Sequence, residues 1–462
     1  MISQSKAAAV LNLGCKVNHY ETEGIKQQFY DAGFDIVPFD AIADVYVINT
    51  CTVTGEAARK SRQMVRRAKR NNKNALVVAV GCDVEMEGER LNADLMIGNN
   101  KKNEVVPEVI ALLAKSNQPG GEKSIEATVV EAGIHIPAGQ KDAALFEEMG
   151  TVVQQSDTRG VIKIQDGCNN FCSYCAIPLA RGRVRSRQPE SIIAEAQALA
   201  AAGFQEIVLT GIHICSYGTE PGFRSRVQNL TGSAASATYL LDLCDKLAEI
   251  RGIERLRLGS LEPKSVTEAF ARQFGANPIL CSHVHLSLQS GSDDILKKMG
   301  RRYTTTDYAA AVAYLRAAVP DILFTTDIIV GFPGESEANH AESLAFCKAI
   351  GFSKIHTFRY SRREGTRAAD MPNQVPGEIA EQRSQDFLDL SEQQERQTAE
   401  KLCGTIQDVL LEQKRAGIWS GYTPGYVQVF ADLGEAAVKA GDIVPLRMGA
   451  YSNVGLTGEW VN

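Results

Sequence analysis

Strand-like runs that alternate with helical stretches are the feature of this sequence that most constrains its fold. Alternating strands and helices form parallel sheets covered by helices. We therefore predict an α/β protein with a parallel N-terminal α/β domain and a partial (β/α)6 barrel. In the first 103 residues the strand-like runs are Ala9–Leu13, Val45–Asn49 and Ala75–Val80. The later runs are Val161–Gln165, Glu206–Thr210, Arg255–Leu258, Val284–Leu288, Ile322–Val330 and Lys354–Tyr360.

Length and changes in composition divide the chain into regions. A chain of 462 residues exceeds one ordinary core and predicts two or three domains. We predict an N-terminal domain over residues 1–115, an irregular linker over 116–157, the barrel over 158–400 and a C-terminal domain over 401–462. Short runs separated by glycines predict a small all-β barrel in the last segment. These runs are Ile406–Glu412, Tyr426–Ala431 and Ile443–Met448.

Composition narrows the classes of protein. Eleven cysteines spread over a long chain favour metal, redox or catalytic use over a secreted disulfide framework. No apolar run approaches the roughly 20 residues of a membrane helix, and the first residues lack the pattern of a signal peptide. We therefore expect a cytoplasmic protein with no membrane partner. Because the net charge is -6, any RNA contact must come from local basic patches.

Three cysteines follow the first predicted barrel strand at the spacing C-x-x-x-C-x-x-C. They are Cys168, Cys172 and Cys175. Three thiolates do not complete a tetrahedral zinc site, and no histidine or fourth cysteine lies nearby in sequence. A cubane iron–sulfur cluster held by three thiolates leaves one iron open for another ligand, so the spacing favours such a cluster. A zinc knuckle completed by a distant ligand, or three structural cysteines, is the alternative.

A second set of three cysteines is dispersed along the N-terminal domain. Cys15, Cys51 and Cys82 each come directly after a predicted strand. The carboxyl ends of parallel strands open onto one crevice, so these thiols can meet at one metal site. Burial as small apolar residues is the alternative. The remaining cysteines show no ligand spacing and we interpret them as packing residues: Cys215, Cys244, Cys281, Cys347 and Cys403.

Together the two cysteine sets resemble the methylthiotransferase family of radical S-adenosylmethionine (SAM) enzymes. The resemblance covers nearly the whole chain and extends to further segments. It implies a cluster-binding N-terminal domain, a radical SAM barrel and a C-terminal TRAM domain that binds RNA. It also implies SAM and two [4Fe-4S] clusters as cofactors, one cluster on each cysteine set. The further segments are Ala176–Gly182, Leu209–Gly211, Gln289–Ser292 and Asp327–Glu335.

The same resemblance implies a reaction and further site residues. In that family the barrel cluster binds SAM through its open iron, electron transfer cleaves SAM to a radical, and the N-terminal cluster supplies or carries sulfur. Tyr174 lies where the superfamily carries an aromatic beside the adenine of SAM. Gly211 and Gln289 are candidate contacts to SAM and Glu262 to SAM or substrate, although each is equally explained as a structural loop residue. His213 stands where relatives commonly have asparagine, and its role is left open.

The substrate is indicated by the segment Leu13–Glu21, which is similar to the threonylcarbamoyladenosine branch of the family. That similarity implies methylthiolation of carbon 2 of this nucleoside at position 37 of tRNA. Isopentenyladenosine in tRNA and a ribosomal protein are the alternatives within the family. A zinc-containing, non-catalytic RNA-binding protein is the alternative from another class. The implied partners are the tRNA anticodon arm and an electron donor such as a flavodoxin or ferredoxin, whereas the sulfur source is not indicated.

Two basic segments are candidates for contacting RNA. At helical spacing Arg59, Arg62, Arg66 and Arg70 share nearly one face, and because like charges repel there, a phosphate backbone explains the face better than helix stability does. A merely solvated face is the alternative. The second segment either grips the anticodon arm or pairs with acidic neighbours. It contains Arg181, Arg183, Arg185 and Arg187.

Aromatic residues of the predicted C-terminal barrel are the third candidate. Small barrels with aromatic faces often stack single-stranded bases, but at least half of these residues are expected in the core. They are Trp419, Tyr422, Tyr426 and Phe430.

Overall fold

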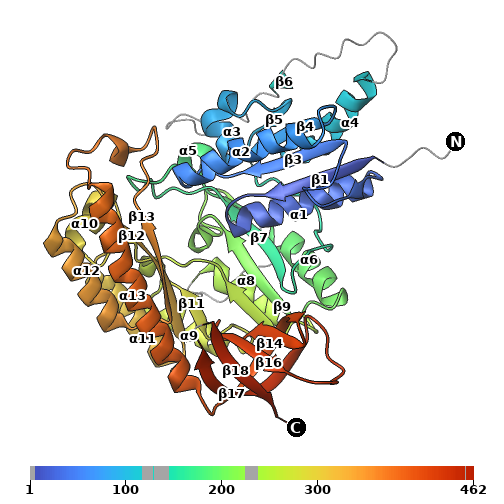
Figure 1. Cartoon of the computed structure of the whole chain (residues 1–462). Helices are drawn as coiled ribbons and strands as arrows, with labels where there is room; N and C mark the ends of the chain where they lie inside the picture. The colour runs from blue at the N-terminus through green and yellow to red at the C-terminus, as the bar shows by residue number, and fades with distance from the viewer. Residues whose placement is uncertain (1–5, 117–127, 130–144, 224–237, 453, 462) are drawn as a thin grey trace. The chain divides into compact units, whose positions relative to one another are not determined.

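The computed structural model describes residues 6–116, 128–129, 145–223, 238–452 and 454–461 (Figure 1). The chain divides into two compact units. The first comprises Met1–Ser156, Lys163–Arg187 and Ser361–Ala369, and the second comprises Asp157–Ile162, Gln188–Tyr360 and Asp370–Asn462. Each unit is described below by itself.

The first unit is built on a six-stranded sheet in the order β2-β1-β3-β4-β5-β6, in which neighbouring strands run parallel. The two central strands are buried at every residue, as expected for a parallel sheet covered on both faces. The strands are β1 (Ala7–Asn12), β2 (Asp35–Ile36), β3 (Val45–Thr50), β4 (Leu76–Gly81), β5 (Leu95–Ile97) and β6 (Thr128–Val129).

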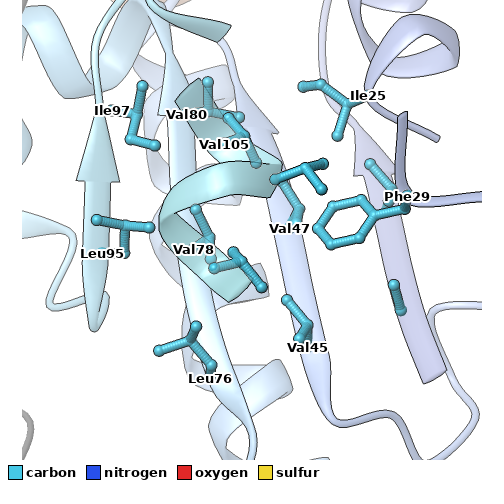
Figure 2. Packing of buried hydrophobic residues seen from close by; sticks show 14 of the residues in the cluster. Ile25, Phe29, Val45, Val47, Leu76, Val78, Val80, Leu95, Ile97 and Val105 are labelled. Atoms are coloured by element: carbon cyan, nitrogen blue, oxygen red, sulfur yellow. The ribbon is translucent and has the colours of Figure 1, made fainter. Parts of the chain in front are cut away.

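Alternate side chains of these strands pack into two cores, because successive residues of a strand point to opposite faces. Val47 and Val78 pack with Ile25, Phe29 and Val105 on one face (Figure 2). The other face packs against the helix α2 (Gly55–Asn71), whose N-terminus is capped by the Thr54 side chain. The remaining helices of this unit are α1 (Lys16–Asp31), α3 (Cys82–Glu87), α4 (Val105–Ser116), α5 (Ile177–Arg181) and the short 3-10 helices at Gly88–Arg90 and Lys102–Glu104.

The barrel strands confirm the predicted partial barrel. β7 is shared by the two units, with the antiparallel strand β8 beside it, in the sheet order β10-β9-β7-β8. A second sheet has the order β11-β12-β13, and a parallel bridge between Leu261 and Leu286 continues the series. The strands are β7 (Gly160–Asp166), β8 (Arg185–Ser186), β9 (Glu206–Gly211), β10 (Arg255–Leu258), β11 (His283–His285), β12 (Leu323–Val330) and β13 (Lys354–Arg359).

Helices separate the barrel strands of the second unit, and capping boxes at Thr304 and Ser336 begin two of them. They are α6 (Pro189–Ala201), α8 (Tyr239–Ala248), α9 (Glu268–Ala276), α10 (Asp293–Met299), α11 (Thr305–Ala318), α12 (Glu337–Ile350) and α13 (Gly377–Leu402). Short 3-10 helices of this unit occur at Ile214–Ser216 and Pro263–Ser265, and a further one, Arg367–Asp370, begins in the first unit.

The C-terminal segment forms the predicted all-β barrel, which is closed in the order β14-β15-β16-β18-β17. It belongs to the same compact unit as β10, whose Arg255 and Arg257 donate to the carbonyls of Tyr422 (3.3 Å) and Pro424 (3.1 Å). Its strands are β14 (Ile406–Arg415), β15 (Ile418–Tyr422), β16 (Gln428–Asp432), β17 (Ile443–Ser452) and β18 (Gly455–Trp460).

Part of the segment predicted as an irregular linker is packed into the first unit. β6 pairs with β5, and Val152 is fully buried. Residues 117–127 and 130–144 of that segment lie outside the described residues. The predicted domain bounds stay a prediction. Within the described part of the chain, no helix is both long and apolar enough to cross a membrane.

Candidate metal centres and cofactor site

The dispersed cysteines lie at the carboxyl edge of one sheet. Cys15 follows β1, Cys51 follows β3 and Cys82 begins α3 directly after β4, and these three strands are neighbours. Burial raises the pKa of the Cys51 thiol to about 12, and the nearby thiols of Cys82 and Cys15 add to this rise. The parallel topology therefore brings together three thiols that are far apart in sequence.

Two glycines let these strand ends approach one another. Gly14 has a φ of +113°, and a Cβ at that position would lie 2.7 Å from Cys51 Sγ. Gly81 has a φ of +104°, and its Cβ would lie 2.6 Å from Asn49 Oδ1. Any side chain at either position would therefore push apart the loops that carry the cysteines.

Buried polar side chains tie the same strand ends together. Asn18 Nδ2 donates to the carbonyls of Leu13 (2.8 Å) and Thr50 (2.9 Å), so one amide links the ends of β1 and β3. Thr50 Oγ1 donates to the Val80 carbonyl (2.8 Å) and accepts from the Asp83 amide (3.1 Å), which links β3 to β4 and α3. Sequence reasoning missed Asn18 and Thr50. Their signal is a polar residue close to a cysteine: Thr50 ends β3 directly before Cys51, and Asn18 lies in the first turn of α1, three residues after Cys15.

The clustered cysteines lie in one loop directly after β7, as predicted. A Cβ at Gly167, where φ is +71°, would lie 1.9 Å from the carbonyl oxygen of Arg183. The Cys168 amide donates to the Gly182 carbonyl (3.1 Å), and the Cys175 amide to the Cys172 carbonyl (3.1 Å). The loop is thus closed against the chain that leaves α5.

A segment from far along the chain braces the same loop within the first unit. The Ala368 amide donates to the Ser173 carbonyl (2.8 Å), and Arg367 Nη2 donates to the Phe171 carbonyl (2.8 Å). The Arg183 guanidinium lies 4.5 Å from the Phe171 ring centroid. Tyr174, between two of the cysteines, is half-buried.

The donor chemistry at both sites is thiolate, the ligand of iron–sulfur clusters. Among the described residues, no group of three or more His, Cys, Asp or Glu side chains is placed to hold a single metal ion. Each thiolate on a cubane binds a different iron, so cluster ligands need not converge on one ion. Three cysteines per site match the ligand count that leaves one iron open.

The second basic segment is mostly internal. Arg181, Arg185 and Arg187 are buried, and Arg187 Nε pairs with Glu148 (2.7 Å). Arg181 Nη1 pairs with Glu21 (2.9 Å) and Asp166 (3.1 Å). Of the two alternatives for this segment, pairing with acidic neighbours is therefore the one observed.

A buried charge network surrounds Arg181. Glu21 pairs with Lys102 (3.1 Å), Lys163 (2.7 Å) and Arg181, and Lys163 also pairs with Asp166 (2.6 Å). Burial opposes ionisation of Glu21, but Arg181 and the two lysines outweigh it and hold the pKa of that carboxyl well below its usual range. Arg185 Nη2 lies 3.6 Å from the same Asp166 carboxylate, so four cations face two carboxylates.

Cys82 also contacts this charge network, through Arg181. Arg181 Nε donates to Cys82 Sγ at 3.2 Å. Burial raises the pKa of Glu85 to about 7 and also raises the pKa of Glu147, so these nearby acids add less negative charge. Cysteine binds metals as a thiolate, and a guanidinium hydrogen bond to the sulfur, in a network with more cations than carboxylates, fits a metal-bound Cys82.

In the second unit the candidate SAM contacts lie at carboxyl ends of barrel strands, where barrel enzymes place their chemistry. Gly211 ends β9, Glu262 follows β10 and Gln289 follows β11 with a φ of +70°. Glu262 Oε2 lies 3.0 Å from His213 Nε2, and Glu262 Oε1 lies 3.8 Å from Arg301 Nη2. The structure thus pairs His213 with a carboxylate at the rim, and the roles of these residues stay predictions.

The predicted basic face is present on α2. Arg59, Arg66 and Arg70 are exposed, while Arg62 is half-buried and pairs with Glu87 (3.3 Å). Arg59 pairs with Glu56 along the helix. RNA binding by this face stays a prediction.

The aromatics of the C-terminal barrel divide between core and surface. Trp419 is buried in the barrel core, and Phe430 is half-buried. Tyr422 and Tyr426 stack with ring centroids 4.9 Å apart, and both lie under the Arg159 guanidinium. These two tyrosines help line a cavity of about 490 Å³.

The packing interpretation of the remaining cysteines holds with one exception. Cys244, Cys281 and Cys347 are buried and Cys215 is half-buried. Cys403 is exposed, so the prediction was wrong for this residue, because it lies just past the end of α13 where no core covers it.

Comparisons with known proteins identify the family. Residues 162–347 match the model of the radical SAM superfamily, and residues 7–98 match that of the Uncharacterized protein family UPF0004. The chain is 34% identical to the threonylcarbamoyladenosine tRNA methylthiotransferase MtaB of Bacillus subtilis, over 90% of this chain and 88% of the relative. The chain belongs to the methylthiotransferase family of radical SAM enzymes. The radical SAM superfamily uses SAM and [4Fe-4S] cluster chemistry.

A second curated relative agrees with this assignment, and a solved structure shares the fold. The tRNA-2-methylthio-N(6)-dimethylallyladenosine synthase of Syntrophus aciditrophicus is 32% identical over 87% of this chain and 83% of the relative. The structure of the radical SAM methyltransferase TsrM from Kitasatospora setae superposes with a TM-score of 0.55 at 16% identity, covering 90% of this chain and 77% of that one. That likeness concerns the fold alone.

Proposed function

We propose that this protein is a tRNA methylthiotransferase that adds a methylthio group to carbon 2 of N6-threonylcarbamoyladenosine at position 37, using SAM and two [4Fe-4S] clusters. The observation that carries the substrate is the similarity to relatives of that name, which are 32–35% identical over 87–97% of this chain. The relatives named for dimethylallyladenosine are 29–33% identical, so that nucleoside is the second candidate.

In this proposal each cysteine set holds one cluster. Cys168, Cys172 and Cys175 hold the barrel cluster, and the trio Cys15, Cys51 and Cys82 holds the N-terminal one. When bound, the barrel cluster supplies the electron that cleaves SAM, and the N-terminal cluster carries sulfur. The chain's own contribution is to fix the two thiolate sets and to orient the reactants. The closed loop after β7 and the hydrogen bonds of Asn18 support that role.

The remaining site residues are proposals about contacts. We assign Tyr174, Gly211, Glu262 and Gln289 to SAM or substrate, since Tyr174 lies in the cysteine loop and the other three lie at barrel strand ends. Arg59, Arg62, Arg66 and Arg70 would contact the phosphates of the anticodon arm.

The proposal also covers domains and partners. We assign residues 1–115 to the cluster-binding domain, 158–400 to the radical SAM barrel and 401–462 to a TRAM domain that binds RNA, with 116–157 between them. A flavodoxin or ferredoxin is the electron donor and the cytoplasm is the compartment, because tRNA and such donors occur there.

The deciding experiment is mass spectrometry of tRNA nucleosides from cells that carry or lack the gene. Loss of 2-methylthio-threonylcarbamoyladenosine on deletion, restored by the wild-type chain and by Cys403→Ala but not by Cys51→Ala, is the expected result. The Cys403 variant is the matched control because that thiol is exposed and outside both sets. Loss of the dimethylallyl product instead would move the assignment to the second candidate. An unchanged nucleoside profile would point to a protein substrate.

Metal analysis separates the enzyme from the zinc-binding alternative. When it is purified without oxygen, the chain should contain iron and acid-labile sulfide in equal amounts and show the visible colour of an iron–sulfur protein. Zinc without sulfide would reject the proposal.

A further inference from the structure

Arg181 is a fully buried arginine whose five N–H groups all have acceptors. Nε donates to Cys82 Sγ (3.2 Å), Nη1 to Glu21 Oε1 (2.9 Å) and Asp166 Oδ2 (3.1 Å), and Nη2 to Asn18 Oδ1 (2.7 Å) and Glu21 Oε2 (3.0 Å). A guanidinium with every donor engaged is fixed in position.

The residues that accept hydrogen bonds from Arg181 lie next to both cysteine sets. Asn18 ties the strand ends beside Cys15 and Cys51, and Cys82 belongs to the same trio. Asp166 ends β7 two residues before Cys168, and Arg181 itself ends α5 six residues after Cys175. A single side chain therefore joins the loop of one set to the sheet edge of the other.

Stability alone does not account for a charge at this place. The cost of removing two charges from water is about as large as their Coulombic attraction, and apolar residues of similar volume often stabilise a core equally well. A cation that donates a hydrogen bond to a ligand sulfur, by contrast, directly affects a bound cluster. Hydrogen bonds to the sulfurs and local net charge are among the factors that set the reduction potential of iron–sulfur clusters.

We propose that Arg181 is a positioning residue of the N-terminal cluster, which holds the Cys82 ligand and raises the one-electron reduction potential of that cluster. This inference rests on the proposed function, because it requires a cluster on Cys15, Cys51 and Cys82. One-electron reduction adds one negative charge to the cluster, and the electron comes from an external reductant. A fixed guanidinium beside the buried sulfur of Cys82 stabilises that added charge, because both side chains are shielded from water.

The test uses the full chain with Cys168, Cys172 and Cys175 all changed to alanine, so that the trio alone can hold a cluster. Arg181→Gln, Arg181→Lys and Arg185→Gln are compared in this parent by dithionite titration followed by electron paramagnetic resonance. Arg185 is the matched control because it is also buried and lies 3.6 Å from Asp166. Its hydrogen bonds go to the carbonyls of Arg181 and Arg183 and to Asn100 Oδ1.

At the potential where half of the parent's clusters are reduced, Arg181→Gln should lower the ratio of reduced to oxidised cluster about tenfold, a shift of about 59 mV for one electron. Arg181→Lys should shift in the same direction by less, and Arg185→Gln should change the ratio least. An unchanged ratio in Arg181→Gln, or equal shifts in Arg181→Gln and Arg185→Gln, would overturn the inference.

Two outcomes separate failure of the inference from failure of its basis. If the parent itself binds no iron and sulfide, the proposed function fails at the N-terminal site. If Arg181→Gln does not fold, as judged by circular dichroism, Arg181→Lys decides. An unchanged potential and spectrum in a loaded Arg181→Lys variant would then refute a role for the fixed guanidinium.

Discussion

The two cysteine sets differ in how the chain brings them together. Cys168, Cys172 and Cys175 share one loop after a single strand, so eight consecutive residues contain the whole set. The other set takes one cysteine from each of three loops between residues 15 and 82, and it exists only because β1, β3 and β4 are neighbours in a parallel sheet. The first site is local, whereas the second depends on strand register.

This difference determines which residues hold each site. The local loop is shaped by Gly167 and braced by the carbonyl of Ser173 against Ala368. The dispersed site relies on Gly14 and Asn18, which allow and hold the approach of neighbouring strand ends. Substitutions of these residues should therefore affect one site and spare the other.

The largest effect is expected for Gly167→Ala. Its Cβ would lie 1.9 Å from the Arg183 carbonyl oxygen at a positive φ, so the loop must move and the barrel cluster should be lost. Iron should fall from about eight to about four atoms per chain, with methylthiolation abolished. Gly203→Ala is the control, since φ is +95° there but no atom lies within 4 Å. Full iron content in Gly167→Ala would show that the loop tolerates the change.

Gly14→Ala should produce the complementary loss. Its Cβ would lie 2.7 Å from Cys51 Sγ, which displaces a ligand of the dispersed site only. Cleavage of SAM to deoxyadenosine should persist while methylthio product disappears. Gly33→Ala, with a φ of +83° and open space, serves as the control. Equal loss of both activities in Gly14→Ala would contradict the separation of the two sites.

Asn18→Ala should have a smaller effect spread over stability and iron content. It removes the amide that links Leu13 to Thr50 and leaves buried carbonyls without this donor, at about 1 to 3 kcal/mol in the free energy of unfolding. Urea denaturation measures this change, and iron analysis should show partial loss from the dispersed site. Gln63→Ala on the exposed side of α2 is the control. A stability equal to the control's would mean that Asn18 does not hold the strand ends.

The smallest effect on the protein itself is expected from Arg66→Gln with Arg70→Gln. Both side chains are exposed and form no ion pair with the described residues, so stability should change by no more than about 0.5 kcal/mol. The slope of the logarithm of tRNA affinity against that of salt concentration should decrease by about 0.7 to 0.9 for each phosphate that the variant no longer neutralises. Arg272→Gln, on an exposed helix of the second unit, is the control. An unchanged slope would show that Arg66 and Arg70 of α2 do not contact tRNA phosphates.

Most of the fold was predictable because strand-like runs are local. The run predicted at Arg255–Leu258 coincides with β10, and the runs near β1, β3, β4, β7 and β9 differ from the structure by one or two residues at their ends. β15 (Ile418–Tyr422) and β18 (Gly455–Trp460) were missed, since each is short and contains glycine or polar residues. β11 ends at His285, before the predicted Leu288.

The spacing of arginines in the sequence did not predict which of them are buried and which are exposed. Arg181 and Arg59 both belong to arginine-rich segments, yet Arg181 is buried among carboxylates and Arg59 is exposed. One of the two carboxylate partners of Arg181, Glu21, is 160 residues away, and no local pattern predicts that encounter. Asn18 was overlooked for the same reason, because its partners belong to three separate segments.

The sequence by itself determined the alternation of strands and helices, the local cysteine loop and the family. Each of these depends on residues that are close along the chain or on the identity of whole segments. Only the tertiary structure decided that Cys82 lies against Arg181 and that Asn18 joins two strand ends. The physical reason is that sheet register and burial depend on free energies summed over distant segments, so a partner's identity emerges only when those segments pack together.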